Sequence, residues 1–192
     1  MKEDYITFDR SKFKDVVLYV CNSCQPSELG NVKLHKVLYF SDMLMFMNTG
    51  RPLTGVDYIK QQFGPTARHL TSVLKELEAA GNLRIDTRSY FGFQKKDYIA
   101  LAKPAAGALG NDEIAILKDV IDFVCEKSAT EISELSHDLA WQLADMGERI
   151  PYAAVLGLQP PEIAQEDIDA ALEEARKVRP IVDRERNAGS VY

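Results

Sequence analysis

The sequence predicts a mainly α-helical domain with a small β-hairpin, in an arrangement compatible with a winged helix, and a C-terminal helical extension. Three observations predict this class. Residues 32–46 are almost wholly apolar and contain no helix breaker, apolar residues recur at helical spacing elsewhere, and two strand-like segments enclose residues 87–97. With 192 residues the chain can bury one sizeable core. We expect the domain over residues 10–158 and a C-terminal helix with a tail over residues 159–192.

The first helix is predicted over residues 10–24, with Asp9 as its N-terminal cap. Its apolar residues recur every three or four positions, as a buried helix face requires: Phe13, Val16, Val17, Val20, Cys21 and Cys24. The Gln25-Pro26 step should end the helix, because the residue before a proline disfavours helical backbone angles. A short connection over residues 26–30 should follow.

A second helix is predicted over residues 32–49, and its composition makes it the centre of the domain. Asn31 suits the N-cap, and Gly50 suits the left-handed residue after the last turn. A helix that is apolar nearly all round is buried on several sides. Only a narrow polar strip remains, formed by Lys33, Lys36 and Asp42. His35 lies next to the lysines and is expected to reach the surface.

Residues 51–62 lack helical periodicity and are predicted to form a turn and extended chain. Gly64 permits unusual backbone angles, and Pro65 suits the first turn of a following helix. That helix should end at Gly81. Its buried face is formed by Leu70, Val73, Leu74 and Leu77. Its outward face carries Arg68, His69, Thr71, Ser72, Lys75 and Glu76.

A β-hairpin is predicted next, with strands over residues 83–86 and 98–101. The long tip between them, residues 87–97, combines aromatic and basic residues: Arg88, Tyr90, Phe91, Phe93, Lys95 and Lys96. A hairpin tip seldom needs three aromatic residues for its own core, and exposed apolar groups often mark a partner surface. The competing interpretation is that the tip packs back on the last helices.

A further helix is predicted over residues 112–126, with Asp112 as its cap. Its apolar face is formed by Ile114, Leu117, Val120, Ile121 and Val124. A short helix should then begin at Ser128 or Thr130.

The next helix should begin at Ser136 or His137 and end near Gly147, with Trp141 as its anchor. Residues 150–152 begin an extended or turn segment. The last helix is predicted over residues 165–179, where acidic residues precede basic ones and suit the helix dipole. Residues 184–192 are expected to form a frayed tail.

The net charge of −6 is unevenly distributed. Residues 51–110 carry nine Lys/Arg against five Asp/Glu, a net +4, whereas residues 111–192 carry eight against eighteen, a net −10. An acidic chain is a poor match for phosphate backbones, so we expect no nucleic acid partner. No apolar run reaches the roughly 18–20 residues that cross a bilayer, and the charged N-terminus lacks the core of a signal peptide. We therefore expect a cytoplasmic protein without membrane association.

The spacing Cys21-x-x-Cys24 is a pattern found in metal sites. A structural zinc site needs four ligands. The other candidate ligands show no matching spacing: His35, His69, His137 and Cys125. Because Cys21 and Cys24 lie on the apolar face of the first helix, we interpret them as buried thiols that pack as small apolar groups. An odd number of cysteines without a secretion signal does not describe a disulfide framework.

The sequence contains no motif for catalysis or phosphate binding. No Ser or Cys nucleophile stands in a recognisable turn, and no pair of carboxylates has a catalytic motif around it. Neither a Walker loop nor a GxGxxG motif is present. We therefore expect neither enzymatic activity nor a cofactor.

The order of helix, turn, helix and hairpin over residues 31–101 resembles a winged-helix module. The alternative function is therefore a DNA-binding transcriptional regulator of its own operon. The helix after Pro65 would read the DNA, and the wing would carry Arg88, Lys95 and Lys96. Against this interpretation, that helix face offers one Arg and no Asn or Gln to base edges. A solvated face is the simpler interpretation.

Three motifs together resemble one known family. They are Lys33-Leu34-x-Lys36-Val37-Leu38-Tyr39-Phe40-Ser41-Asp42, Gly50-Arg51-Pro52-Leu53-Thr54 and Phe63-Gly64-Pro65. At these spacings the chain resembles the SocA-like Panacea domain antitoxins of type II toxin–antitoxin systems, which occur in bacteria and prophages. Further residues resemble the second half of the family's domain: Leu135-Ser136-His137, Trp141 and Ile150-Pro151-Tyr152. The resemblance covers residues 12–155.

The resemblance implies a non-enzymatic antitoxin that binds and neutralises a cognate toxin, such as an inhibitor of translation. It implies an architectural role for the matched positions: Leu38, Tyr39, Phe40, Asp42, Gly64, Pro65 and Trp141. Partner contacts are instead predicted on the outward helix face and the hairpin tip: Arg68, His69, Ser72, Lys75, Arg88, Tyr90, Phe91, Phe93, Lys95 and Lys96. The acidic C-terminal part could cover a basic toxin surface. A second copy of the chain is a further candidate partner.

Overall fold

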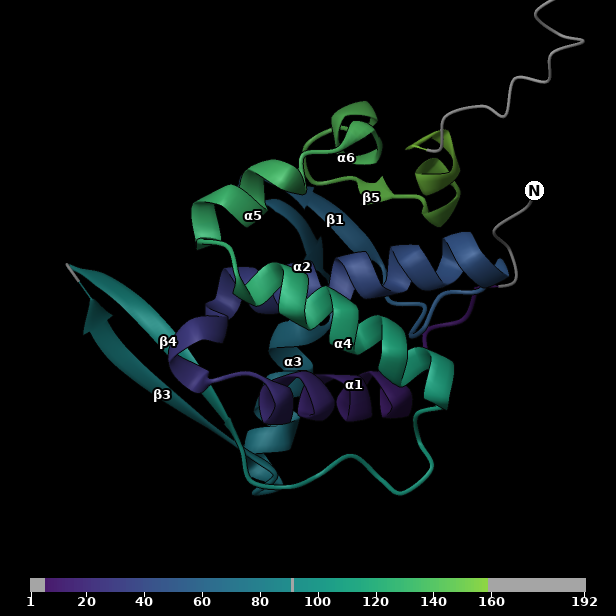
Figure 1. The fold of residues 1–192 in the computed structure, drawn as a ribbon. Helices are drawn as coiled ribbons and strands as arrows, with labels where there is room; N and C mark the ends of the chain where they lie inside the picture. The colour runs from purple at the N-terminus through teal and green to yellow at the C-terminus, as the bar shows by residue number, and fades with distance from the viewer. Residues whose placement is uncertain (1–5, 91, 159–192) are drawn as a thin grey trace, which may run out of the picture. The chain divides into compact units, whose positions relative to one another are not determined.

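The structure is a computed structural model that describes residues 6–90 and 92–158. Its elements are α1 (Arg10–Ser23), α2 (Pro26–Thr49), β1 (Tyr58–Gln61), β2 (Gly64–Ala67), α3 (Leu70–Ala79), β3 (Leu83–Tyr90), β4 (Phe93–Ala100), α4 (Asn111–Cys125), α5 (Ala129–Leu135), α6 (Leu139–Leu143), β5 (Arg149–Ile150) and the 3₁₀-helix η1 (Tyr152–Leu158). The predicted class, mainly α-helical with a hairpin, is confirmed (Figure 1). The helix and tail predicted over residues 165–192 lie outside the described residues. Among the helices of the described part, none is long and apolar enough to cross a membrane.

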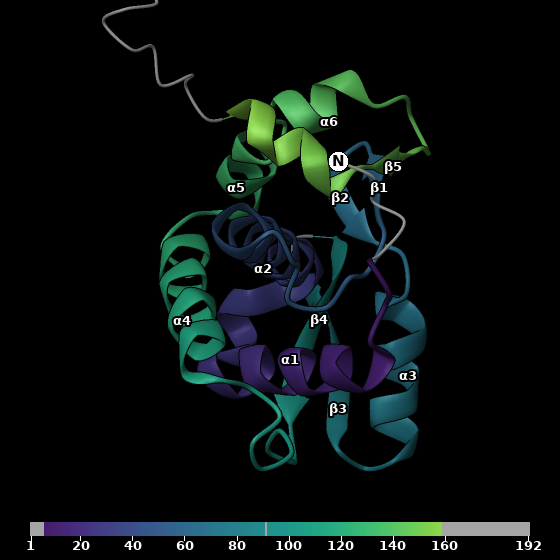
Figure 2. The same cartoon turned by 90° about the vertical axis from the view of Figure 1, so that its right-hand side faces the viewer.

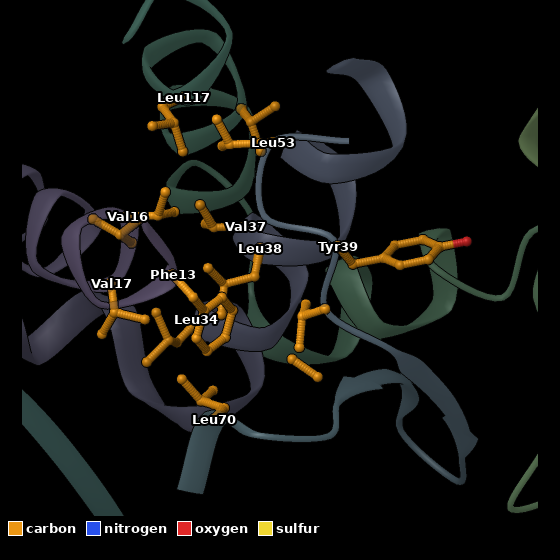
Figure 3. Packing of buried hydrophobic residues seen from close by; sticks show 14 of the residues in the cluster. Phe13, Val16, Val17, Leu34, Val37, Leu38, Tyr39, Leu53, Leu70 and Leu117 are labelled. Atoms are coloured by element: carbon orange, nitrogen blue, oxygen red, sulfur yellow. The ribbon is translucent and has the colours of Figure 1, made fainter. Parts of the chain in front are cut away.

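Helix α2 is the centre of the fold, as its apolar composition predicts. It packs against α1, α4, α5, β2, β4 and η1 (Figures 1 and 2). Figure 3 shows Leu34 and Leu38 of α2 gathered with Phe13 of α1 and Leu70 of α3. All four side chains are buried. The periodic apolar residues of separate helices therefore form one core around α2.

The start of α2 differs from the prediction, whereas its end agrees. The helix begins at Pro26, is interrupted by Gly30 (φ 57°, ψ 173°) and continues from Asn31. The predicted connection over residues 26–30 and the predicted N-cap role of Asn31 are therefore wrong. Glycine adopts a positive φ without a Cβ penalty, so Gly30 joins a short helical segment over residues 26–29 to the long segment that begins at Asn31. Gly50 ends the helix with φ 72°, as predicted.

Strands β1, β2 and β5 form a small antiparallel sheet in the order β2-β1-β5. Pro65 lies in β2 opposite Lys60, so the prediction that it begins the next helix is wrong. β2 is an edge strand, the place in a sheet where proline is tolerated because it cannot donate a hydrogen bond. Helix α3 begins later, at Leu70, and buries the four apolar residues predicted for it.

The hairpin has longer strands and a shorter tip than predicted. β3 and β4 pair from Leu83 opposite Ala100 to Tyr90 opposite Phe93. Most of the predicted tip over residues 87–97 is therefore paired strand. Charged residues and residues that favour turns can still be part of a β-ladder, because the partner strand supplies their backbone hydrogen bonds.

The three helices predicted between residues 112 and 147 are present with different ends, and the 3₁₀-helix η1 begins at Tyr152, where an extended or turn segment was predicted. Gly110 caps α4, so the predicted cap Asp112 is wrong and lies in the first turn. Ser128 caps α5, which is one of the two predicted starts. Asp138 caps α6, and this helix stops at Leu143 instead of reaching Gly147.

Candidate partner-binding surface

Asp42 joins two of the sequence motifs inside the core. Its carboxylate accepts hydrogen bonds from the Thr54 N–H (2.6 Å), the Thr54 hydroxyl (2.6 Å) and the Tyr58 hydroxyl (2.7 Å). The side chain has no exposed surface, and burial raises its pKa although these hydrogen bonds oppose the shift. Asp42 therefore does not lie on an exposed polar strip of α2. Its carboxylate instead holds the segment that follows α2 against the helix.

Three basic residues of α2, Lys33, His35 and Lys36, are also buried, and the last two contact β2. His35 is 8% exposed, so the expectation that it reaches the surface is wrong. Its Nδ1 accepts a hydrogen bond from the Ala67 N–H (3.1 Å), and Lys36 Nζ donates to the Pro65 carbonyl (2.9 Å). Desolvation lowers the pKa of Lys36 to about 7 and that of His35 to about 4. Both side chains hold β2 against α2.

Gly64 lies where β2, α2 and α5 meet. Its φ is 90°, and an added Cβ would lie 2.2 Å from Ser136 Oγ and 2.6 Å from Lys36 Nζ. Both the backbone angle and the close approach of these side chains require glycine. The Phe63-Gly64-Pro65 motif therefore serves the packing of three elements.

Helix α6 is held by two residues of the resemblance. The Tyr39 hydroxyl donates to Asp138 Oδ2 (2.9 Å), and Trp141 Nε1 donates to the Gln61 carbonyl (3.2 Å). Figure 3 shows the Tyr39 hydroxyl pointing away from the apolar cluster. The first contact ties α6 to α2, and the second ties it to β1. Lys60 Nζ also lies 4.1 Å from the centre of the Trp141 ring.

The motif residues are thus largely inaccessible to a partner. Leu38, Tyr39, Asp42, Gly64 and Pro65 are buried. Phe40 and Trp141 are half-buried. A contact surface must therefore be formed mainly by other residues.

On α3, much of the predicted contact face is already engaged with the N-terminal segment. Ser72 Oγ accepts from Arg10 Nη2 (3.0 Å), and His69 stacks on Phe8 with ring centroids 4.8 Å apart. Arg68 lies 3.9 Å from Asp57 and keeps 63% of its side chain exposed. Lys75 is exposed. The face offers a partner mainly the outer parts of Arg68 and Lys75.

The predicted basic residues of the hairpin fall into two groups: Arg88 and Lys95 lie near a buried carboxylate, whereas Lys96 is exposed. Arg88 Nε lies 3.1 Å and Lys95 Nζ 3.8 Å from the buried carboxylate of Asp97. The single negative charge of Asp97 offsets only one of these two cations, and Arg88 keeps 67% of its side chain exposed, so the hairpin still presents positive charge. Phe91 lies outside the described residues, and Tyr90 and Phe93 are placed only as the last pair of the ladder.

A groove of about 970 Å³ lies beside the hairpin. Its walls are the first turns of α2, residues 94–96 of β4 and the start of α5. Lys95 Nζ crosses to the carbonyl of Ser27 at one side of it. The groove therefore brings the predicted contact residues Lys95 and Lys96 together with α2 residues such as Glu28 and Lys33 that were not predicted.

The large apolar residues that are exposed lie mainly on other elements, which the sequence did not single out. Apart from Leu101, all large apolar side chains exposed in the described residues lie on or next to α2, α4, α5, α6, η1 and the β1–β2 turn. They are Leu44, Phe63, Phe123, Leu135, Leu139, Leu143, Met146 and Leu156, here called the apolar surface. The four-residue spacing from Leu135 to Leu143 was the available signal, but such spacing ordinarily indicates burial. Leu143 is instead 74% exposed.

The elements that carry the apolar surface adjoin one another. The rings of Phe40 in α2 and Phe123 in α4 meet edge to face with centroids 6.1 Å apart. α5 and η1 pack on α2, and α6 packs on η1. In Figure 2, where α2 is seen end-on, α4 lies to its left and α5, α6 and η1 lie above it.

This part of the chain is also its acidic part. Residues 111–158 carry ten Asp/Glu and three Lys/Arg, a net −7. Asp119, Asp122, Glu126 and Glu134 are exposed on α4 and α5. Exposed apolar groups among carboxylates match an apolar partner surface surrounded by basic residues.

The cysteine pattern does not build a metal site in the described residues, where no three His, Cys, Asp or Glu side chains are placed to hold an ion. Cys21 is buried, in agreement with its interpretation as a packing residue. Cys24 contacts Cys125 of α4, a proximity that residue spacing gave no means to predict.

Comparison with known proteins identifies the family. The family model for the SocA-like antitoxin, Panacea domain, matches residues 34–142. No curated protein and no solved structure matches the chain. The matched part exceeds half of the 192 residues and extends from α2 into α6, so it includes the contacts of Asp42, Gly64 and Tyr39. The chain belongs to the SocA-like Panacea domain antitoxin family.

Proposed function

We propose that this protein is a non-catalytic antitoxin that neutralises a cognate toxin by binding it directly. The family match over residues 34–142 is the observation that carries this proposal. The buried role of the motif residues supports a binding platform, because their polar groups are used to join elements of the fold. Residues 10–158 would form the platform.

The proposed contact is the apolar surface. A partner that covers Leu139 and Leu143 would remove large exposed side chains from water, which is favourable by about 25 cal/mol per Å² of apolar area. The surrounding elements are tied to α2 by Tyr39 and by the Phe40–Phe123 contact, so this surface is built on ordered elements.

The net −7 of residues 111–158 argues for a basic toxin. Complementary charge speeds association and selects partners. Toxins that act on RNA, including inhibitors of translation, need basic surfaces to bind phosphates. We therefore expect the carboxylates around the apolar surface to face the toxin's nucleic-acid-binding residues.

The residues predicted on α3 and the hairpin form a second candidate contact. The exposed parts of Arg68, Lys75 and Lys96 make this face basic, so it would suit an acidic region of a partner. It is tested separately by the double variant Lys75→Glu/Lys96→Glu.

The test is growth rescue in cells that express the product of the neighbouring reading frame together with this protein. The wild-type protein should restore growth, and Leu139→Asp/Leu143→Asp should not, because two carboxylates in an apolar contact would be desolvated. Leu101→Asp is the matched control, because Leu101 is 57% exposed and lies after β4, away from the apolar surface. Rescue by the Leu139→Asp/Leu143→Asp variant would refute this contact. A neighbouring product that neither inhibits growth nor binds the protein would refute the antitoxin function with that partner.

A further inference from the structure

Two cysteines from distant parts of the chain meet beside α2. Cys24 Sγ and Cys125 Sγ lie 3.4 Å apart. Cys24 is the C-cap of α1 with extended backbone angles (φ −109°, ψ 149°), and Cys125 is the last residue of α4. A disulfide has an S–S distance of about 2.05 Å. Because each residue ends its helix, a small shift of either helix end would close the difference without disturbing a helix interior.

The two thiols differ in their surroundings. Cys125 is half-buried, and its carbonyl accepts a hydrogen bond from Lys33 Nζ (3.1 Å). The contact with Cys24 lowers the pKa of Cys125, and Lys33 lowers it further. The same contact, together with burial, raises the pKa of Cys24. Because Cys125 is the more accessible of the two thiols and has Lys33 beside it, Cys125 is the partner that meets an oxidant first, and Cys24 is its neighbouring thiol.

We propose that Cys24 and Cys125 are an oxidant-sensitive pair that forms an intramolecular disulfide with hydrogen peroxide as the oxidant. The Cys125 thiolate attacks one peroxide oxygen, so that an S–O bond forms, the O–O bond breaks and water leaves after protonation. The product is a sulfenic acid on Cys125. The Cys24 sulfur then attacks the sulfenic sulfur, the S–O bond breaks, and the hydroxyl group leaves as water with the Cys24 proton. Two thiols are oxidised and one peroxide is reduced to two water molecules.

The disulfide would fasten the end of α1 to the end of α4 across a long stretch of chain. Closing so long a loop removes many conformations from the unfolded state and stabilises the folded one. Lys33, whose Nζ donates a hydrogen bond to the Cys125 carbonyl, also lines the groove beside the hairpin. Oxidation would therefore fix one wall of that groove. This inference does not depend on the proposed toxin binding.

Cys21 is the natural control, because it lies in α1 and is 3% exposed. Burial raises its pKa to about 12, so it stays protonated near neutral pH. It also lies at the i−3 position of Cys24, on the same helix. The Cys-x-x-Cys pattern is therefore not the redox pair; the pair is Cys24 with Cys125.

The test treats the reduced full-length chain with hydrogen peroxide and maps its peptides without reduction. We expect a Cys24–Cys125 cross-linked peptide lacking two hydrogen atoms and a monomer on a non-reducing gel. The melting temperature should rise by about 5 °C or more and return on treatment with dithiothreitol. Cys24→Ser and Cys125→Ser should abolish the cross-link, and Cys21→Ser should retain it.

Three results would overturn the inference. They are oxidation of Cys125 to the sulfinic acid without a cross-link, a cross-link that contains Cys21, and a cross-link between two molecules. The peptide map of the wild-type chain gives each of these results directly, so the conclusion does not rest on whether a variant folds.

Discussion

Asp42 accepts its hydrogen bonds from residues that follow α2 in the chain, and all of them lie inside the core. A buried donor left without an acceptor costs about 1–3 kcal/mol. The carboxylate therefore fixes how the segment around Thr54 and Tyr58 lies against the helix. Lys36 and His35 do the same for β2. At the scale of single residues, the polar groups of α2 specify the arrangement of its neighbours.

Gly64→Ala tests the close packing of three elements. The added methyl group would contact Ser136 Oγ and Lys36 Nζ at less than 3 Å, and the positive φ would be strained. We expect a loss of about 2–4 kcal/mol in the free energy of unfolding, measured in urea. Gly81→Ala is the matched control, because its φ is 71° and no atom lies within 4 Å of the added Cβ. Equal losses in both variants would show that backbone strain alone accounts for the effect.

His35 should make stability depend on pH. Burial, and to a smaller extent Lys36, lowers its pKa from 6.5 to about 4 in the folded chain. Between these values the unfolded chain binds more protons, so stability falls as the pH falls from about 6.5 towards 4. We expect the free energy of unfolding to drop by about 2 kcal/mol between pH 7 and pH 5.

The variant His35→Asn provides the control for this dependence. Asparagine offers an acceptor to the Ala67 N–H and does not titrate, so most of the drop should disappear. His137, whose pKa is also lowered by burial, would leave a smaller slope. A drop of unchanged size in the variant would contradict the assignment to His35.

At the scale of elements, the long periodic helices could be predicted and the irregular junctions could not. The apolar spacing of α1 and α4 gave their extents to within a residue or two, and that of α3 gave its buried face but not its start. The expectations for Asn31 and Pro65 failed because each residue suits the start of a helix, whereas here the tertiary contacts of α2 and β2 decide the local structure. The hairpin strands were underestimated because charged residues such as Arg88 and Lys95 have low strand preference on their own.

Tyr39→Phe tests how α6 is attached to α2. The change removes the hydrogen bond to Asp138 Oδ2 and keeps the ring packing. We expect a loss of about 1 kcal/mol in stability and faster amide hydrogen exchange over residues 138–143. Tyr98→Phe is the control, because it removes a hydrogen bond to Asn31 at the other end of α2. Equal exchange changes in α6 for both variants would contradict a specific attachment.

At the scale of the whole molecule, the family could be predicted from the sequence and the apolar surface could not. The motifs around Asp42 and Gly64 carry the resemblance because the fold needs those residues at those spacings. Exposure of Leu139 and Leu143 depends on where α6 sits relative to α2 and η1, which no spacing within the chain reveals. The predicted contacts on α3 and the hairpin stay a prediction.

Calorimetric titration of the purified protein with the product of the neighbouring reading frame tests the central claim most directly. We predict saturable binding by the wild-type chain, at least ~100-fold weaker binding by Leu139→Asp/Leu143→Asp, and an unchanged affinity for Leu101→Asp. Circular dichroism of both variants would establish that they are folded. Wild-type affinity in the Leu139→Asp/Leu143→Asp variant, with a loss of binding in Lys75→Glu/Lys96→Glu, would contradict the apolar surface and place the contact on α3 and the hairpin.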